Sequence, residues 1–83
     1  NKNPVDFIGV ASEPDCTLHL LSAEGIRGGT GSGRANVDSY DLVASVQMIQ
    51  GDHSVTIWAT DPSGRESSRL LVQLPIENLE TKL

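Results

Sequence analysis

The chain has 83 residues, a single cysteine, and eleven acidic against six basic residues, which give it a net charge of −5. This length accommodates one domain, and one cysteine excludes both an internal disulfide and a cysteine-based zinc site. The few scattered basic residues argue against nucleic-acid binding, and no apolar run approaches the roughly 20 residues of a membrane-spanning helix. The chain begins without Met or a signal-type apolar segment, so we expect a module of a longer protein.

Two strands are predicted at the start of the chain. Val5–Val10 forms the first and ends before a turn around Pro14, which cannot donate to a ladder. Cys16–Leu21 forms the second. Its alternation places three side chains on one face of the strand, namely Cys16, Leu18 and Leu20.

A glycine-rich segment follows, after a short third strand expected within Ala23–Arg27. We expect 28–34 to form a mobile loop with no regular element, because glycine loses the most backbone entropy on ordering. The letters GGTGSGRA resemble a phosphate-binding loop, but Arg34 replaces its lysine and Ala35 its hydroxyl residue. Neither a preceding buried strand nor a following helix is predicted, so we interpret the segment as an inter-strand loop.

The segment Tyr40–Ile49 alternates in a way that favours a strand with its even-numbered residues facing inward. These residues are Leu42, Ala44, Val46 and Met48. Helical spacing of Leu42, Val46 and Ile49 leaves a helix as the alternative, although the β-branched content favours a strand.

A hairpin of Val55–Thr60 and Ser67–Leu74 is the strongest structural signal. The intervening Asp61-Pro62-Ser63-Gly64 suits a type I turn. A turn centred on Pro62-Ser63 predicts that Val55 faces Leu70 across the ladder, that Ile57 faces Ser68 and that Ala59 faces Glu66. The predicted inward set is Val55, Ile57, Ala59, Leu70, Val72 and Leu74.

Together these segments predict one all-β domain over residues 1–83. Six or seven short strands with regular turn signals indicate an antiparallel β-sandwich of two sheets. We expect the core to lie within 5–74 and 75–83 to be a linker or tail.

Two stretches resemble bacterial immunoglobulin-like repeats of the kind found in large surface adhesins. Ile8-Gly-Val-Ala-Ser-Glu-Pro-Asp-Cys-Thr-Leu-His-Leu20 is similar to the opening of such repeats. Gly51-Asp-His-Ser-Val-Thr-Ile-Trp-Ala-Thr-Asp-Pro-Ser-Gly-Arg-Glu-Ser68 is similar to their closing hairpin. The middle of the chain departs from the family pattern, and Asp15 replaces the usual turn glycine. The resemblance implies an immunoglobulin-like sandwich of about seven strands.

The resemblance also carries expectations about packing and placement. It puts Cys16 and Ala59 where a cross-sheet disulfide would sit, with Ala59 removing the partner cysteine. It implies chain ends at opposite ends of the module, sheets that resist extension by shearing, and location outside the cell or on its surface. Calcium at domain junctions is a further implication. The candidate ligands are the loop and strand carboxylates Asp6, Asp15, Asp38, Asp41, Asp52 and Asp61, foremost among them Asp6 and Asp61.

Candidate site residues are few. No local signature of nucleophilic catalysis occurs, and Cys16 and His19 point to opposite faces of their strand, so we assign no catalytic residue and no resident cofactor. Cys16 is expected to be a small buried hydrophobe. Trp58 faces outward beside Arg69 and Leu71, either as a ligand surface or as local cover with a cation–π contact to Arg69.

We therefore expect a non-catalytic spacer module that contacts neighbouring domains and takes part in adhesion. The chain is expected to be monomeric. The alternative is an accessory module of a secreted enzyme that binds glycan or protein through Trp58 and the loop at 28–34.

Overall fold

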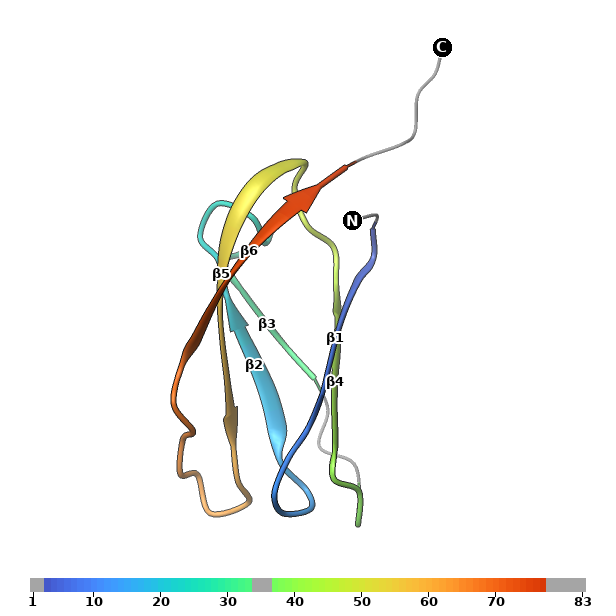
Figure 1. The fold of residues 1–83 in the computed structure, drawn as a ribbon, viewed down its shortest axis with the longest axis vertical. Helices are drawn as coiled ribbons and strands as arrows, with labels where there is room; N and C mark the ends of the chain where they lie inside the picture. Colours follow the sequence, from blue (N-terminus) through green and yellow to red (C-terminus); the bar gives the residue numbers. More distant parts are fainter. Residues whose placement is uncertain (1–2, 34–36, 78–83) are drawn as a thin grey trace.

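The computed structural model describes residues 3–33 and 37–77, and these residues form strands and turns without a helix. The strands are β1 (Val5–Val10), β2 (Thr17–Leu21), β3 (Thr30–Ser32), β4 (Asp41–Val46), β5 (Gly51–Thr60) and β6 (Leu70–Ile76). They build two antiparallel sheets, one in the order β1-β4 and the other in the order β3-β2-β5-β6 (Figure 1). The predicted all-β class and the two sheets are confirmed, with six strands in the described residues rather than about seven.

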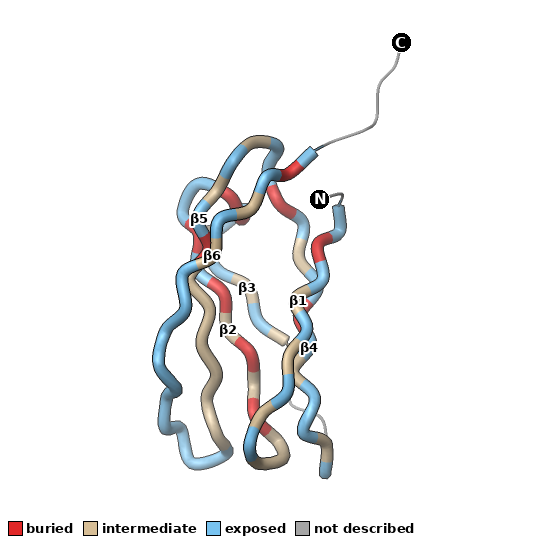
Figure 2. The backbone as a smooth tube through the Cα atoms, viewed as in Figure 1, coloured by how far each residue is buried: buried red, intermediate tan, exposed pale blue. Residues whose placement is uncertain are grey.

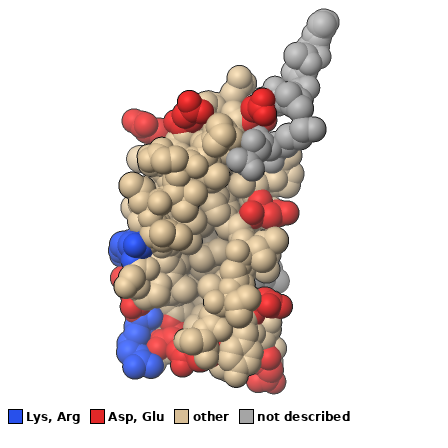
Figure 3. Space-filling view, in the orientation of Figure 1, with Lys and Arg blue, Asp and Glu red and all other residues tan. Residues whose placement is uncertain are grey.

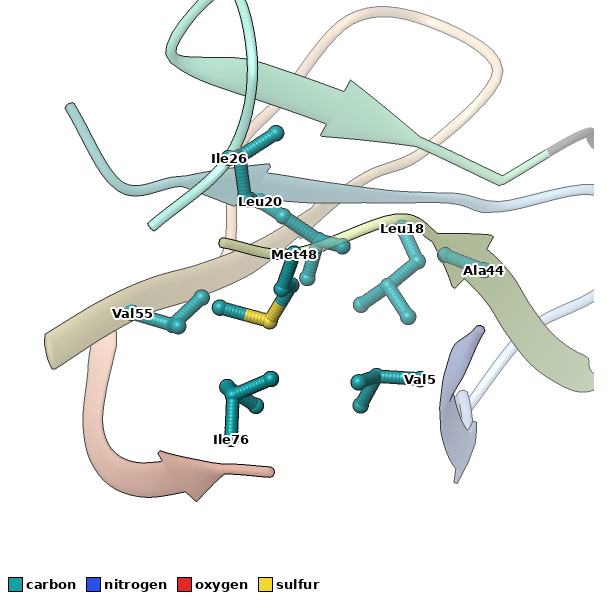
Figure 4. Close-up of a cluster of buried hydrophobic side chains, with 8 residues drawn as sticks. All are labelled: Val5, Leu18, Leu20, Ile26, Ala44, Met48, Val55 and Ile76. Carbon is teal, nitrogen blue, oxygen red and sulfur yellow. The ribbon is translucent and has the colours of Figure 1, made fainter. Parts of the chain in front are cut away.

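The core lies between the two sheets. Leu20 on β2 and Val55 on β5 are almost completely buried, with 1% and 0% of their surface exposed. Figure 4 shows side chains from both sheets converging on this core, namely Val5, Leu18, Leu20, Ile26, Ala44, Met48, Val55 and Ile76. Buried and exposed residues alternate along β2 and β4, as the period of a strand requires (Figure 2).

The alternation predicted for the first half of the chain is confirmed. Cys16, Leu18 and Leu20 are buried on one face, and the segment around Ala44 is a strand rather than a helix. β4 ends at Val46, and Met48 is buried beyond it through a bridge to Ile26.

The glycine-rich segment differs from the prediction. Ala23–Arg27 lies in a turn instead of a strand, and the third strand is Thr30–Ser32, which pairs with β2. Gly28 and Gly29 adopt φ angles of 85° and 86°, which suit glycine and turn the chain back toward β2. A side chain at Gly31 would lie 2.6 Å from Val46 Cγ1, so this glycine lets β3 approach β4. Packing therefore outweighs the entropy cost that predicted an irregular loop. Residues 34–36 lie outside the described residues.

The β5–β6 hairpin has the predicted faces but a different register. Ile57 pairs with Leu70 instead of Ser68, so the prediction was wrong by two residues. Gly64, at a φ of 93°, adds one residue to the turn, and the segment between Glu66 and Leu70 adds another. Because the shift is even, Val55 and Ile57 still face inward with Leu70 and Val72.

The last strand also extends further than predicted. β6 begins at Leu70 and continues to Ile76, which is buried in the core. The core therefore reaches two residues beyond 74, and the part of the predicted tail at 78–83 lies outside the described residues.

The first and last strands meet at one end of the molecule. Val5 and Ile76 belong to the same buried cluster, and β1 begins at the end where β6 finishes (Figure 1). The prediction that the chain enters and leaves at opposite ends is therefore wrong for these six strands. The number of strands explains the difference, because six antiparallel passes return the chain to the end where it entered, whereas the seven strands implied by the resemblance would not.

Candidate functional site

Trp58, His19 and Arg69 form a cluster on the outer face of the four-stranded sheet. Trp58 lies on β5 directly opposite His19 of β2, and the two rings stack with centroids 5.5 Å apart and planes inclined by 20°. The Arg69 guanidinium carbon lies 3.9 Å from the centroid of the indole ring. The predicted cation–π contact between Trp58 and Arg69 is confirmed, and it is worth about 0.5 to 1 kcal/mol at an exposed site.

Polar contacts hold the two neighbours of Trp58 in place. The His19 Nε2 atom lies 2.9 Å from the Thr60 hydroxyl oxygen, and Arg69 donates to a Glu66 carboxylate oxygen at 3.1 Å. His19 approaches the indole from β2 and Arg69 from the β6 side, and these strands flank β5 on opposite sides. The indole therefore presents its edge, rather than a free face, to an incoming ligand.

Leu71, the third residue of the predicted ligand surface, lies further along the same face. It pairs with Thr56 and is exposed. A shallow hollow of about 280 Å³ lies on the other side of the cluster, where Thr30 and Ser32 of β3 line it together with His19 and Trp58. The structure thus brings Trp58 and Arg69 together, and it places Thr30 and Ser32 of the 28–34 segment beside Trp58, as the alternative binding function expected.

A larger hollow of about 530 Å³ opens at the opposite end of the molecule from Val5. Its wall is formed by the β1–β2 loop and the β5–β6 loop, with Cys16, Leu42 and Ala59 among its lining residues. Glu13, Asp61, Arg65 and Glu66 also line it, so the hollow carries charges of both signs. Figure 3 shows basic atoms at the lower left of the face drawn, with acidic atoms beside them and elsewhere on the same face.

Cys16 lies in the wall of this hollow as a buried thiol, as predicted. Its sulfur donates to the Glu13 carbonyl oxygen at 3.5 Å. Burial raises the pKa of the Cys16 thiol, and the carboxylates of Glu13, Asp61 and Asp15 raise it further. The thiol therefore stays protonated at neutral pH, which makes it a poor nucleophile.

The expected relation of Cys16 to Ala59 across the sheets is wrong. β2 and β5 are neighbours in one sheet, where Ala59 pairs with Leu18. A cysteine at 59 would thus lie beside β2 in the same sheet rather than across the core. The sequence pattern could not show this, because it does not specify which strands pair.

Asp61 organises the β5–β6 turn. One carboxylate oxygen accepts hydrogen bonds from the Ser63 amide at 3.0 Å, the Ser63 hydroxyl at 2.8 Å and the Arg65 amide at 2.9 Å. The other oxygen accepts from Arg65 Nε at 2.8 Å, and the Gly64 amide donates to the Asp61 carbonyl at 2.9 Å. The predicted type I turn and its carboxylate bonds to the backbone are confirmed.

These bonds predict an acid-sensitive turn. The hydrogen bond from the Ser63 hydroxyl, with those from Arg65 and the nearby guanidinium, holds the pKa of Asp61 well below its usual range. A folded-state pKa below the unfolded value near 4 stabilises the fold above that pH, and this contribution is lost as the pH falls through the folded value. Asp61→Asn should therefore be less stable than the parent at pH 7 and should lose less stability between pH 5 and pH 2.

Urea unfolding measured over this pH range tests the prediction. Ser63→Ala removes the hydroxyl donor but keeps the carboxylate, so its acid dependence should lie between those of the parent and Asp61→Asn. Parallel pH curves for the parent and Asp61→Asn would show that the turn contributes nothing to acid sensitivity.

The two foremost calcium candidates, Asp6 and Asp61, are not brought together, although the Asp15 carboxylate accepts a hydrogen bond from the Asp38 amide at 2.7 Å. Asp6 is exposed on β1 opposite Ser45, while both oxygens of Asp61 are engaged within its own turn. His53 lies at the far end of β5, with Nε2 2.8 Å from the Ile49 carbonyl oxygen. Across 3–33 and 37–77, no three His, Cys, Asp or Glu side chains converge in a way that could hold a metal ion.

Comparison with protein-family models, with curated proteins and with solved structures finds no match. The search for membrane-spanning helices likewise finds none among the residues that the structure describes. The function must therefore be argued from the strand order and the surfaces described above.

Proposed function

We propose that this chain is a non-catalytic immunoglobulin-like module that spaces and orients neighbouring domains of a larger bacterial extracellular or cell-surface protein. The strand order carries this proposal. Immunoglobulin-type sandwiches place strands B and E next to each other in one sheet and C, F and G in the other, where C′ joins C in the variable type. The orders β1-β4 and β3-β2-β5-β6 agree with B-E and C′-C-F-G taken in chain order.

The position of the chain ends changes the mechanical part of the proposal. Because β1 begins and β6 finishes at the same end, a load applied there peels β1 from β4 and β6 from β5 one residue pair at a time. Peeling opposes a load more weakly than simultaneous shearing of a whole ladder. The role supported by these six strands is therefore to set the relative position of neighbouring domains rather than to bear tension.

Fluorescence energy transfer between domains fused to the two ends of the full chain tests this role. The folded module should give one narrow distribution of short distances, because its described ends lie together. A glycine-serine linker of equal length is the control and should give a broad distribution. Equally broad distributions for both fusions would contradict the proposal.

The hollow beside Trp58 supports a second candidate function, the binding of glycan by an accessory module. Thr30 and Ser32 offer hydroxyl groups there, and the indole edge offers apolar surface. A glycan array probed with the parent chain and with Trp58→Ala separates the two candidates. Binding that disappears in Trp58→Ala would overturn the pure spacer function, whereas absence of binding by the parent would eliminate the glycan-binding candidate.

A further inference from the structure

The outer edge of β1 is unpaired in the described part of the chain. β1 forms a ladder with β4 along its whole length, Val5 to Val10, and with no other strand of the two sheets. The backbone groups of an edge strand that point away from its neighbour are a template for pairing with another extended chain. A sheet of only two strands also gains the most from a third.

The other edges of the two sheets are protected from pairing with a further strand, whereas the outer edge of β1 is more open to it. β6 contains Pro75, which has no amide hydrogen to donate, and β3 is only three residues long. The edge of β4 lies against β3, because a side chain at Gly33 would overlap the Val43 carbonyl. β1 has six residues with neither proline nor lysine among them, and its only charged residue, Asp6, opposes pairing with an acidic strand but not with a basic or neutral one.

Apolar side chains between the sheets remain uncovered on the β6 side. Leu70 shares the inward face with Val55 and Val72, yet 61% of its surface is exposed, whereas Val55 is completely buried. Phe7 of β1 and Ile57 of β5 are only partly buried against the core. Figure 2 shows that β6 is largely exposed along the part that precedes its buried end. The two-stranded sheet is too narrow to cover the inward face of the four-stranded sheet.

We propose that the free edge of β1 binds an extended segment of another polypeptide, which adds a third strand to the β1-β4 sheet. Its backbone pairs with β1, and aliphatic side chains at alternate positions face Leu70. The segment is basic or neutral, because the chain has a net charge of −5. The same charge opposes pairing with a second copy of this chain. This inference does not rest on the spacer function.

Amide hydrogen exchange of the full chain, followed by NMR, tests the proposal with the peptide Lys-Val-Thr-Val-Lys-Val-Thr-Val-Lys, acetylated and amidated at its ends. Binding should slow exchange at every second amide of β1, namely those that point away from β4. A control peptide carries N-methyl groups on the amides of both edges. It keeps the charge and the side chains but cannot donate along either edge, and it should give no protection of β1.

Two variants of the protein locate the bound side chains. Leu70→Thr should weaken peptide binding about tenfold, because the peptide no longer covers a leucine on the inward face. Leu71→Thr is the matched control, since Leu71 is 62% exposed but faces outward opposite Thr56, and it should change the affinity less than about twofold. The amide spectra report whether both variants fold.

Several results would overturn the proposal. They are uniform or absent protection of β1, equal binding of the N-methylated peptide, and equal weakening by Leu70→Thr and Leu71→Thr. Alternate protection that rises with protein concentration without peptide, together with a doubled mass, would assign the edge to a second copy and refute the proposed occupant.

Discussion

Leu20→Ala should lower the free energy of unfolding by roughly 3 to 5 kcal/mol, the largest effect expected of any single substitution considered for this chain. Leu20 lies near the middle of β2 with 1% of its surface exposed, and its side chain packs where the two sheets meet (Figure 4). Truncation removes buried methyl groups and leaves a cavity that the paired strands on either side cannot readily close. Urea unfolding followed by Trp58 fluorescence measures the change.

Leu21→Ala is the control for this substitution. Leu21 is the next residue of the same strand, but it faces outward opposite Thr56 and is partly exposed. Its truncation should cost less than about 1 kcal/mol. Because a slip of one residue in β2 would exchange the roles of the two leucines, similar losses for both would contradict the register of this strand.

The faces of the strands were predictable because the period of a strand is short and one face must be buried. Ala44 shows this well, since its place among even-numbered apolar residues was sufficient to predict burial without any knowledge of its partners. The prediction that Val72 and Leu74 face inward was also correct, although the predicted register was wrong. An error of two residues leaves each side chain on the same face of the strand.

The register itself depends on details of the β5–β6 connection that the turn motif does not determine. Asp61 and Gly64 specified the turn type correctly. Whether Gly64 then adds a residue to the turn depends on its backbone conformation, and the excursion before Leu70 depends on hydrogen bonds between Ser67 and Ala59. The excursion before Leu70 is a tertiary feature without a local sequence signal, whereas a glycine directly after a type I turn is itself a local signal for one added residue.

The candidate site was predictable where it is local in sequence and not elsewhere. Trp58 and Arg69 belong to one hairpin, so their contact followed from alternation. His19 completes the cluster from β2, and the placement of β2 beside β5 requires knowledge of the strand order. If β2 had been known to pair with β5, the outward-facing His19 and Trp58 would have been predicted to contact each other.

Gly33→Ala should destabilise the protein by roughly 2 to 3 kcal/mol, although it adds only one methyl group. The added carbon would overlap the backbone carbonyl of Val43 on β4. Since Val43 is held in the β1-β4 ladder opposite Ile8, relief requires one of the two strands to move. The substitution also strains the hydrogen bond that the Gly33 amide donates to the Leu18 carbonyl at 2.8 Å.

Gly9→Ala separates this steric cost from the general effect of replacing glycine. Its added carbon would lie 3.8 Å from the Leu42 side chain, an ordinary contact, so we expect a change between about zero and a gain of 1 kcal/mol. The difference between the two variants in urea unfolding measures how tightly β3 closes against β4. Equal stabilities would mean that the end of β3 does not lie against β4. The outer edge of β4 would then be as free as the outer edge of β1. The argument that β1 is the binding edge would lose one of its supports, because it partly rests on β3 covering the edge of β4.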